Sequence, residues 1–415
     1  MTEPSPTKRK IIPVVARSVT NESGAQNFNF TALPPLALYV HIPWCVRKCP
    51  YCDFNSHEAK GAIPEREYVD ALITDLEHDL PRVWGRKLKS IFIGGGTPSL
   101  FAPASIDRLL CAVRARLPFV SPDIEVTLEA NPGTVEQGKF AELRAAGVNR
   151  LSIGVQSFAA DALERLGRIH GAKEAVRAAE QAHAAGFDNF NLDLMFGLPG
   201  QTSDTAANDV ATAIALEPTH ISYYQLTLEP NTLFAARPPT LPEDDAIAAI
   251  QERGQHALAE HGYAQYEVSA YARAGKQCAH NLNYWTFGDY LGIGAGAHAK
   301  ISDAQTQSIQ RLWKVKNPRD YLAAVPGSTH IGGVSTLTLA DVGFEFMMNA
   351  LRLNDGFETR LFTERTGLPL SVVEAQLMHA QRKGWIETTH THIRATQQGL
   401  RYLNDVLEGF LPAGR

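Results

Sequence analysis

The sequence predicts an α/β protein: an incomplete, TIM-like (β/α)6 barrel followed by a smaller, mostly helical domain. Six short apolar runs alternate with six segments of helical period between residues 36 and 261. Gly147 and Gly186 follow two of these helical segments where helix caps are expected, and each precedes the next apolar run. Strands and helices that alternate with short connections form parallel sheets, whose chemistry lies at the carboxyl ends of the strands.

The predicted elements follow from the apolar periodicity. The predicted strands are 36–42, 90–93, 124–128, 150–155, 189–196 and 220–226. The predicted helices are 65–80, 104–117, 135–146, 172–185, 204–216 and 243–261. In the second helix Cys111 stands among Leu109, Leu110 and Val113, which predicts a buried, unreactive thiol.

Composition divides the chain into four predicted segments. Residues 1–34 are rich in Ser, Thr, Pro and Asn and are predicted to be a disordered lead-in, with a short strand at 11–15. Residues 35–275 form the barrel, and 276–340 form an irregular segment that covers it around Trp313. Residues 341–415 are predicted to form a winged-helix-like module. Its predicted elements are helices at 341–352, 361–366 and 371–383, a hairpin near 385–394 and a helix at 397–407.

Length and charge exclude several classes of protein. The chain has 415 residues and a formal net charge of −5, which argues against a nucleic-acid-binding role for the C-terminal module. No apolar run reaches the ~18 residues of a transmembrane helix, and the N-terminus lacks the apolar core of a secretory signal. Five cysteines, three of them clustered, are not a disulfide framework and indicate a reducing cytoplasm.

The clustered cysteines directly follow the first predicted strand. Cys45, Cys49 and Cys52 have the spacing C-x3-C-x2-C, and charged residues such as Arg47 and Lys48 stand between them, which argues against a packed core. Three thiolates can hold a metal centre while leaving one coordination position open. A structural zinc site is normally closed by a fourth ligand, and none is convincingly spaced here. A [4Fe–4S] cluster with one open iron is therefore favoured over zinc.

Polar or glycine residues end the next predicted strands. Gly94, Gly95 and Gly96 follow the second strand and let the backbone approach a ligand closely, although an ordinary tight turn is the alternative. Further strand ends carry Glu129, Gln156 and Asp193. Asp193 lies in an otherwise apolar strand, where a charge is costly unless it is paired. Acid, amide and acid on three successive strands predict a polar lining for a ribose and an ammonium group.

The cysteine loop resembles that of the radical S-adenosylmethionine (SAM) superfamily. That resemblance implies that the open iron is chelated by the amino and carboxylate groups of SAM, and that the reduced cluster cleaves SAM to a 5′-deoxyadenosyl radical. Tyr-x-His-Ile-Pro, Gly-Gly-Gly-Thr-Pro, Glu-x-x-Pro, Gly-Val-Gln and Asp-Leu-x-x-Gly-Leu-Pro occur in this order. Together they resemble oxygen-independent coproporphyrinogen III oxidase and its paralogues over residues 36–410. The resemblance implies SAM contacts at Tyr39, Tyr51, Gly95, Gly96, Thr97, Glu129, Gln156, Arg168 and Asp193, with Cys45, Cys49 and Cys52 on the cluster.

One departure from the oxidase distinguishes a branch of that family. The oxidase has a further cysteine two residues after the third, where this chain has Phe54. Cys-Asp-Phe-Asn-Ser and a later His-Asn-x-x-Tyr-Trp are instead similar to haem-chaperone paralogues. The predicted haem-binding residues are His280, Asn281, Tyr284 and Trp285. A His beside Tyr and Trp offers an iron ligand and aromatic faces for a porphyrin, whereas simple packing at a domain junction is the alternative. Cys278 is a weaker candidate for a second ligand.

The resemblance implies a haem chaperone that binds haem and a SAM-ligated [4Fe–4S] cluster and delivers haem to respiratory haem proteins. The alternative is the oxidase reaction, two oxidative decarboxylations that give protoporphyrinogen IX. The radical machinery is complete in sequence, but we expect no oxidase activity. The cluster requires an electron donor; transient membrane association and a cluster-dependent homodimer stay open.

The glycine-rich residues 290–298 are expected near the SAM adenine, with His298 facing the same cavity.

Overall fold

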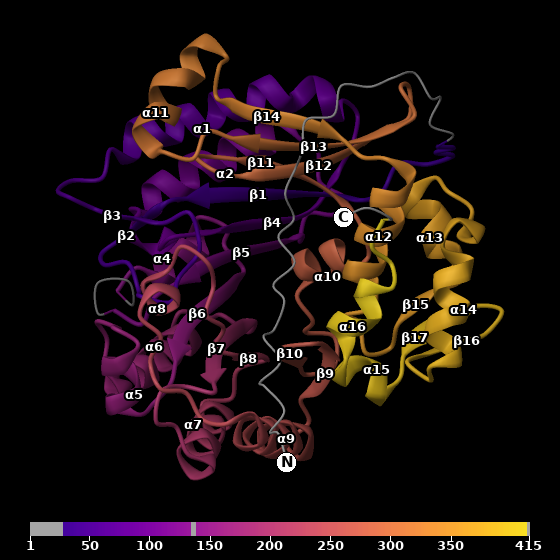
Figure 1. Ribbon diagram of the computed structural model, residues 1–415. Helices are drawn as coiled ribbons and strands as arrows, with labels where there is room; N and C mark the ends of the chain where they lie inside the picture. Colours follow the sequence, from indigo (N-terminus) through magenta and orange to yellow (C-terminus); the bar gives the residue numbers. More distant parts are fainter. Residues whose placement is uncertain (1–27, 134–137, 413–415) are drawn as a thin grey trace.

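The computed structural model describes residues 28–133 and 138–412. All six predicted strands are present, and they lie side by side and parallel in a large sheet (Figure 1). In sheet order they are β1 (Leu36–Ile42), β4 (Leu88–Gly95), β5 (Glu125–Ala130), β6 (Arg150–Gln156), β7 (Phe190–Phe196) and β8 (His220–Gln225). The sheet order has two ends, so the strands form the incomplete barrel that the sequence predicts.

Helices connect these strands at nearly the predicted places. The longer ones are α1 (Glu65–Asp79), α2 (Pro103–Arg116), α6 (Ala172–Ala184), α7 (Ser203–Ala215) and α9 (Asp244–Glu260). The shorter ones are α4 (Phe140–Ala145), α5 (Ala160–Arg165) and α8 (Leu233–Ala236). The helix predicted at 135–146 is therefore shorter among the described residues; residues 134–137 lie outside them.

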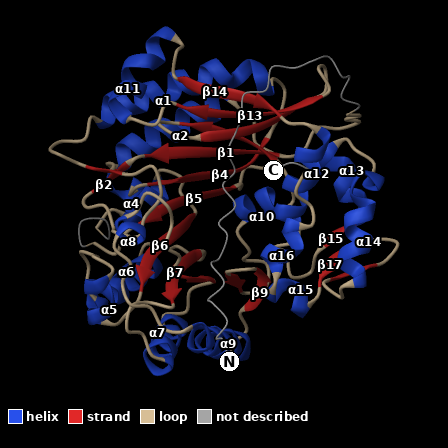
Figure 2. Cartoon of the chain, in the orientation of Figure 1, coloured by secondary structure: helices blue, strands red, loops and turns tan. Residues whose placement is uncertain are grey.

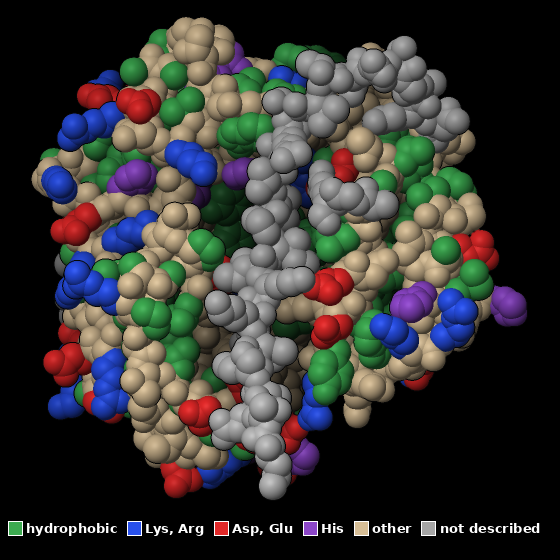
Figure 3. Space-filling view, viewed as in Figure 1, with side chains coloured by type: hydrophobic (Ala, Val, Ile, Leu, Met, Phe, Trp, Pro, Cys, Tyr) green, Lys and Arg blue, Asp and Glu red, His purple; other side chains and the backbone are tan. Residues whose placement is uncertain are grey.

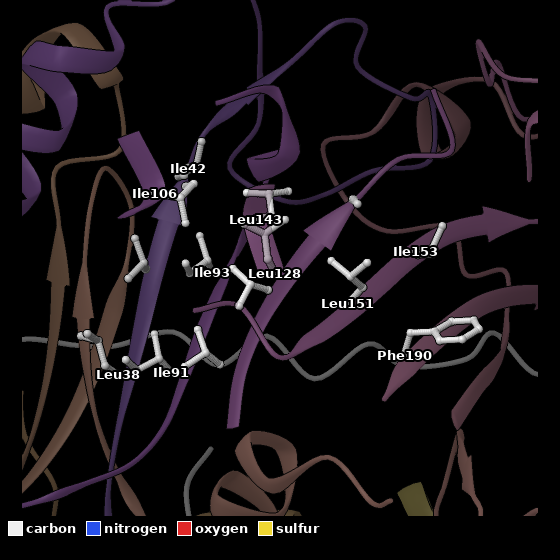
Figure 4. Close-up of a cluster of buried hydrophobic side chains, with 14 of the residues drawn as sticks. Leu38, Ile42, Ile91, Ile93, Ile106, Leu128, Leu143, Leu151, Ile153 and Phe190 are labelled. Atoms are coloured by element: carbon white, nitrogen blue, oxygen red, sulfur yellow. The ribbon is translucent and has the colours of Figure 1, made fainter. Parts of the chain in front are cut away.

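The two faces of the parallel strands differ in polarity because side chains alternate along a strand. Along β7, Phe190 and Leu192 belong to the main hydrophobic cluster, which also includes residues of the surrounding helices (Figure 4). Asn191 and Asp193 alternate with them along the strand. These two side chains form hydrogen bonds with each other and with polar groups of the neighbouring strands. Burying each Leu or Phe of the outer layer stabilises the fold by roughly 1.5–3 kcal/mol. The polar positions are left to line the barrel interior.

Both edges of the parallel sheet are extended. Four strands continue it beyond β1: β11 (Asp289–Ile293), β12 (His298–Asp303), β13 (Ser308–Lys314) and β14 (Ile331–Thr336). β10 (Ala270–Ala272) and β9 (Ala264–Glu267) continue it beyond β8. A short helix, α10 (Ala279–Trp285), joins the two extensions. The irregular cover expected around Trp313 is therefore wrong, because Trp313 lies within β13.

Buried ion pairs explain why the extension was missed. β13 ends in Lys314, whose side chain is 1% exposed and lies 2.5 Å from Asp75 and 2.7 Å from Asp79 of α1. In β12 the buried Lys300 lies 2.9 Å from Asp289 of β11. A charged residue in a short apolar run indicates a loop when the sequence is read locally. Lys314 can be buried because Asp75 and Asp79, more than two hundred residues earlier in the chain, pair with its charge.

The C-terminal part has its own hydrophobic core. Its elements are α12 (Leu339–Ala350), β15 (Phe357–Glu358), α13 (Thr359–Thr366), α14 (Glu374–Arg382), β16 (Ile386–Thr388), β17 (His392–Ala395), α15 (Gln397–Arg401) and α16 (Leu403–Glu408). Three helices followed by a hairpin give the predicted winged-helix-like order, and the final predicted helix is interrupted at Tyr402 (Figure 2). Phe28 and Phe30 are buried in this core, so the prediction of disorder is wrong for these two residues, and residues 1–27 lie outside the described part of the chain. The strand predicted at 11–15 lies outside the described residues.

Two further predictions concern exposure. Cys111 is exposed on α2, and the prediction of a buried thiol is wrong. The buried stripe of α2 comprises Ile106, Leu109, Leu110 and Val113, and residue 111 lies beside that stripe rather than on it. Within the described ranges, no helix combines the length and the apolar character needed to cross a membrane.

Candidate functional site

The glycine loop after β4 packs directly against the start of the cysteine loop. The amide of Gly96 donates to the Ile42 carbonyl at 2.8 Å, and the amide of Thr97 donates to the Trp44 carbonyl at 2.7 Å. A Cβ at residue 96 would lie 2.5 Å from the Trp44 carbonyl oxygen, and Gly95 has a φ of 119°. Tight packing therefore requires both glycines. The loop also fixes the cysteine segment at the carboxyl end of the sheet.

The three cysteines are half-exposed on this loop. Burial raises the pKa of Cys45, and the neighbouring Cys52 and Cys49 thiols raise it further, since each disfavours a second negative charge nearby. Iron binding would relieve this cost, because cluster irons take thiolates as ligands. Across the described parts of the chain, no three His, Cys, Asp or Glu side chains are grouped as a single metal ion requires.

Arg168 joins the cysteine loop to the strand ends. One guanidinium nitrogen lies 3.6 Å from the Cys49 sulfur, and the other donates to the Asn131 side chain at 2.9 Å and to the Gly154 carbonyl at 2.6 Å. Its Nε is buried and has no hydrogen-bond partner among the described residues. A buried donor without an acceptor is costly, so this cation fits an anionic group that binds beside the cysteines.

The acid, amide and acid predicted from three successive strands do converge. Glu129 accepts a hydrogen bond from the Gly95 amide at 2.9 Å, and burial, with the Asp193 charge adding, raises its pKa to about 7. Asp193 is held by Asn191 at 2.8 Å, and its pKa is also raised by burial. Gln156 ends β6 with a φ of 71°, a strained conformation for a residue other than glycine, and strain of this kind clusters at functional sites.

A cavity of about 600 Å³ opens at this end of the sheet, within the usual size range of ligand sites. Of the predicted SAM-contacting residues, Tyr39, Gly95 and Glu129 line it. His41 of β1 lines it as well, and Pro230 and Asn231 do so from the loop after β8. The remaining lining residues come from the cysteine loop, α10 and the β11–β13 extension, and include Lys48, Phe54, Asn55, His57, Tyr284, Tyr290, His298 and Lys316. The face of the molecule shown in Figure 3 is hollowed, and basic side chains (blue) and histidine side chains (purple) lie at the visible edge of the hollow.

The remaining predicted SAM residues lie around this centre. Thr97 accepts a hydrogen bond from Asn131 at 2.9 Å. Tyr51 packs on Phe234 with ring centroids 6.3 Å apart, and burial raises its pKa. Gln156 accepts a hydrogen bond from the Tyr224 hydroxyl at 2.7 Å.

Several residues of this site were not predicted, and Tyr224, Asn131, Asn55 and His57 are examples. Tyr224 and Asn131 stand at the ends of β8 and β5, so the strand-end rule that found Glu129 also signals them. Asn55 donates to the Ala295 and Lys316 carbonyls, each at 2.9 Å, and ties the cysteine loop to the β11–β13 extension. His57 lies beside it, with its Nε2 3.2 Å from the Asn55 oxygen. Asn55 belongs to the Cys-Asp-Phe-Asn-Ser motif, but nothing local in the sequence signals the contacts that these last two residues make.

His280, the predicted haem ligand, does not line the cavity. It is 1% exposed, its Nδ1 lies 3.1 Å from the Ser90 hydroxyl, and its ring packs on Phe92 with centroids 5.1 Å apart. Burial, together with the Arg150 charge, lowers its pKa to about 3. The Tyr284 ring also packs on it, with centroids 5.0 Å apart. Its Nε2 is buried without a partner among the described residues.

The other residues of that motif have different surroundings. Tyr284 lines the cavity. Trp285 lies under Arg352, whose guanidinium carbon is 4.3 Å from the centre of the indole ring, and Asn281 is half-buried. Cys278 is buried against Glu125, with its sulfur 3.4 Å from the carboxylate. The structure therefore brings only Tyr284 of the four predicted haem residues to the cavity, and Cys278 is not available there as a second ligand.

Glu125 fixes the helix that carries this motif. Its carboxylate accepts hydrogen bonds from the amides of Ala279 at 2.9 Å and His280 at 3.0 Å, at the first turn of α10. The buried guanidinium of Arg150 lies 3.9 Å away. An acid at the start of a helix satisfies otherwise unpaired amides and complements the helix dipole. α10 is thus anchored to the opening residue of β5.

The fold and these loops can now be compared with known proteins. Residues 39–213 match the model of the radical SAM superfamily, and residues 337–402 match the HemN C-terminal domain. The chain is 50% identical over 379 residues to a protein of Escherichia coli K12 named heme chaperone HemW, covering 91% of this chain and 99% of that one. The chain belongs to the HemW family. The resemblance inferred from the sequence motifs is thereby confirmed.

A second HemW relative agrees with this assignment, and a solved structure shares the fold. The HemW of Bacillus subtilis is 35% identical over 378 residues, 90% of this chain and 98% of its own. The coproporphyrinogen III oxidase HemN of E. coli, described as a radical SAM enzyme, has the same fold, with a TM-score of 0.77, 25% identity and coverage of 91% and 90%. Membership of the radical SAM superfamily implies a [4Fe–4S] cluster and SAM.

Proposed function

We propose that this member of the HemW family is a haem chaperone that binds haem together with a SAM-ligated [4Fe–4S] cluster and passes the haem to respiratory haem proteins in the cytoplasm or at the membrane. The observation that carries the proposal is the identity of 50% along nearly the whole length of a protein named heme chaperone. The oxidase reading has less support, because the oxidase HemN is only 25% identical over a similar length.

In this proposal Cys45, Cys49 and Cys52 hold the cluster, and SAM occupies its open iron. Arg168 supports the placement of SAM, because its buried Nε has no acceptor within residues 28–133 and 138–412 and suits the SAM carboxylate. Glu129 supports it too, because it faces the cavity beside the cysteine loop and can accept hydrogen bonds from the ribose or the ammonium group. The further SAM contacts that we propose are Tyr39, Tyr51, Gly95, Gly96, Thr97, Gln156 and Asp193. When bound, the cluster and SAM supply one-electron chemistry, which requires an external electron donor.

The cavity supports haem as the second ligand. Tyr284 and Tyr290 pack edge to face with ring centroids 4.4 Å apart, and both line the cavity. Phe54, at the position of the oxidase's additional cysteine, lines it as well and is 59% exposed. Aromatic faces suit a porphyrin, and Lys48 and Lys316 on the same walls suit its propionates. For His280, Asn281 and Trp285 a haem contact would require α10 to shift.

Haem transfer tests the proposal. The cluster is reconstituted anaerobically, haem is titrated by absorbance, and the loaded protein is mixed with membranes that contain a haem-depleted respiratory enzyme. We expect one haem per chain, followed by its appearance in the acceptor. Haem pre-loaded on serum albumin is the control for passive transfer. Failure to bind haem, or transfer no faster than from albumin, would contradict the chaperone function. Light scattering of the protein with and without its reconstituted cluster also shows whether the cluster promotes a dimer.

A further inference from the structure

Three histidines line the cavity, and they differ in how their ring nitrogens are used. His41 has both nitrogens engaged, since Nδ1 lies 3.0 Å from the Tyr39 hydroxyl and Nε2 lies 2.9 Å from the Asn55 carbonyl. His57 has Nε2 at 3.2 Å from the Asn55 side chain, and a backbone hydrogen bond to Lys316 holds the ring further. Both of these imidazoles hold the loops together and offer no free lone pair.

His298 is the exception. It is the first residue of β12, it is exposed, and its ring stacks on Trp313 with centroids 6.5 Å apart and an angle of 27° between the planes. Among the residues that the structure describes, neither of its ring nitrogens has a hydrogen-bond partner. Partial burial, followed by the Arg311 and Lys316 charges, lowers its pKa. The imidazole is therefore neutral near pH 7 and keeps a lone pair for a metal.

We infer that His298 would bind the haem iron, and that Tyr284, Tyr290 and Phe54 would contact the porphyrin and Lys48 and Lys316 its propionates. This inference rests on the proposed function, because it names the ligand set for the haem of a haem chaperone. It moves the iron ligand from His280 of the His-Asn-x-x-Tyr-Trp motif, which does not line the cavity, to His298, which does.

The chemistry of the cavity wall supports this placement. Lys316 is exposed on the segment that follows β13, and Lys48 is exposed on the cysteine loop, where its Nζ donates to the Phe54 carbonyl at 3.1 Å. These two cations among the lining residues match the two propionates of a haem. Asp53 of the cysteine loop also lines the cavity and is the acidic residue nearest to Lys48 in the sequence. Tyr290 is held in place by Arg311, which donates to its hydroxyl and also lies 2.5 Å from Glu345.

The haem and SAM regions of the cavity come from different elements. The SAM side consists of the carboxyl ends of β1, β4 and β5, represented in the lining by Gly95 and Glu129. The histidine side consists of β3 (His57–Glu58), the start of β12 and the segment after β13. His280 is on neither side, because Tyr284 and Phe92 pack against its ring. Tyr284 can therefore contact a porphyrin while His280 stays beneath it.

Ligand replacement tests the inference on the full-length protein. Haem is titrated anaerobically into wild type, His298→Ala, His280→Ala and His261→Ala, and the spectra are compared by absorbance and by electron paramagnetic resonance of the ferric form. His261 is the matched control, since it is an exposed histidine at the end of α9, and its Nδ1 lies 2.8 Å from the Ala257 carbonyl. Circular dichroism confirms that each variant is folded; His298 is exposed, so its truncation leaves no buried void.

We expect His298→Ala to lose the imidazole-ligated spectrum and to weaken haem binding about tenfold or more. Added imidazole should restore the spectrum in that variant. We expect His261→Ala and His280→Ala to retain the wild-type spectrum, and Lys316→Glu to weaken binding with a reduced dependence on salt. An unchanged spectrum in His298→Ala, or a spectrum lost in His280→Ala and restored there by imidazole, would overturn the inference. Wild type that binds no haem would instead overturn the proposed function.

Discussion

The strand-end site and the helix α10 carry the two most informative motifs of this chain, and they present their side chains in opposite ways. At the strand ends, Glu129 and Gly95 face an open cavity. On α10, His280 points into the packed interior, and Trp285 lies under Arg352 of the C-terminal part. Both motifs combine polar and aromatic residues that suit a ligand. Only the first is placed by a general rule of the fold.

The difference has a physical cause. The carboxyl ends of parallel strands meet at one edge, so residues at those ends share a cavity whatever their sequence distance. A connecting helix has no such rule, and its orientation depends on its partners. For α10 these are Glu125 at its first turn and Ser90 and Phe92 on β4. A motif on such a helix therefore predicts a role more weakly than the same residues at a strand end.

The largest expected effect concerns the strand-end site. Cys45→Ala, Cys49→Ala and Cys52→Ala combined should abolish the iron–sulfur absorbance completely, because the two other cysteines stand apart from this loop: Cys111 is exposed on α2, and Cys278 is buried against Glu125. The thiols are half-exposed, so the thermal midpoint of the metal-free protein should change by no more than a few degrees. Residual cluster absorbance after reconstitution would show that other residues hold it. Cys111→Ala is the matched control and should leave the cluster intact.

The anchoring of α10 provides the next largest effect. Glu125→Ala should lower the free energy of unfolding by about 3 kcal/mol, because it leaves two helix amides without their acceptor and the buried Arg150 without its ion-pair partner. Glu125→Gln keeps an acceptor oxygen and should lose less. Denaturant unfolding measures both. Equal stability of Glu125→Ala and wild type would mean that α10 is not held as described.

The Glu129 carboxyl provides a pH-dependent comparison. Its folded pKa of about 7 lies above its ordinary value of 4.5, so its contribution to stability is full below pH 4.5 and is lost as the pH rises through 7. Between pH 5.5 and 8 wild type should therefore lose on the order of 2 kcal/mol more unfolding free energy than Glu129→Gln. SAM binding should instead strengthen as the pH rises, because the ionised Glu129 is the better hydrogen-bond acceptor. It should weaken in Glu129→Gln. Identical pH profiles would contradict this assignment; Glu142→Gln, an exposed change on α4, is the control.

The smallest expected effect separates the two aromatic residues of the α10 motif. Trp285→Ala should change haem affinity less than twofold and lower stability by about 1 kcal/mol, since its ring contacts Arg352 outside the cavity. Tyr284→Ala removes a cavity wall and should weaken haem binding measurably. Haem titration of the two variants side by side distinguishes them. A larger loss of haem affinity in Trp285→Ala would place the haem at the domain junction.

Much of the barrel was predictable from the sequence. Strand 36–42 has the predicted boundaries, because Pro35 and Pro43 bound its apolar run on either side. The cysteine loop and Glu129 follow from the strand-end rule. The β11–β14 extension was not predictable, since Lys314 reads as a loop residue until its partners Asp75 and Asp79 are known. The burial of His280 was not predictable either, because the residues that pack against it, Ser90 and Phe92, lie almost two hundred positions earlier in the sequence.

The most direct test of the central claim uses one anaerobic, cluster-reconstituted sample for two assays. Haem is titrated by absorbance, and the same protein is incubated with SAM, a reductant and coproporphyrinogen III, with product followed by porphyrin fluorescence after oxidation. The account predicts stoichiometric haem binding and no protoporphyrinogen IX. Decarboxylated product over many turnovers would contradict it and would assign the chain to the oxidase reaction instead.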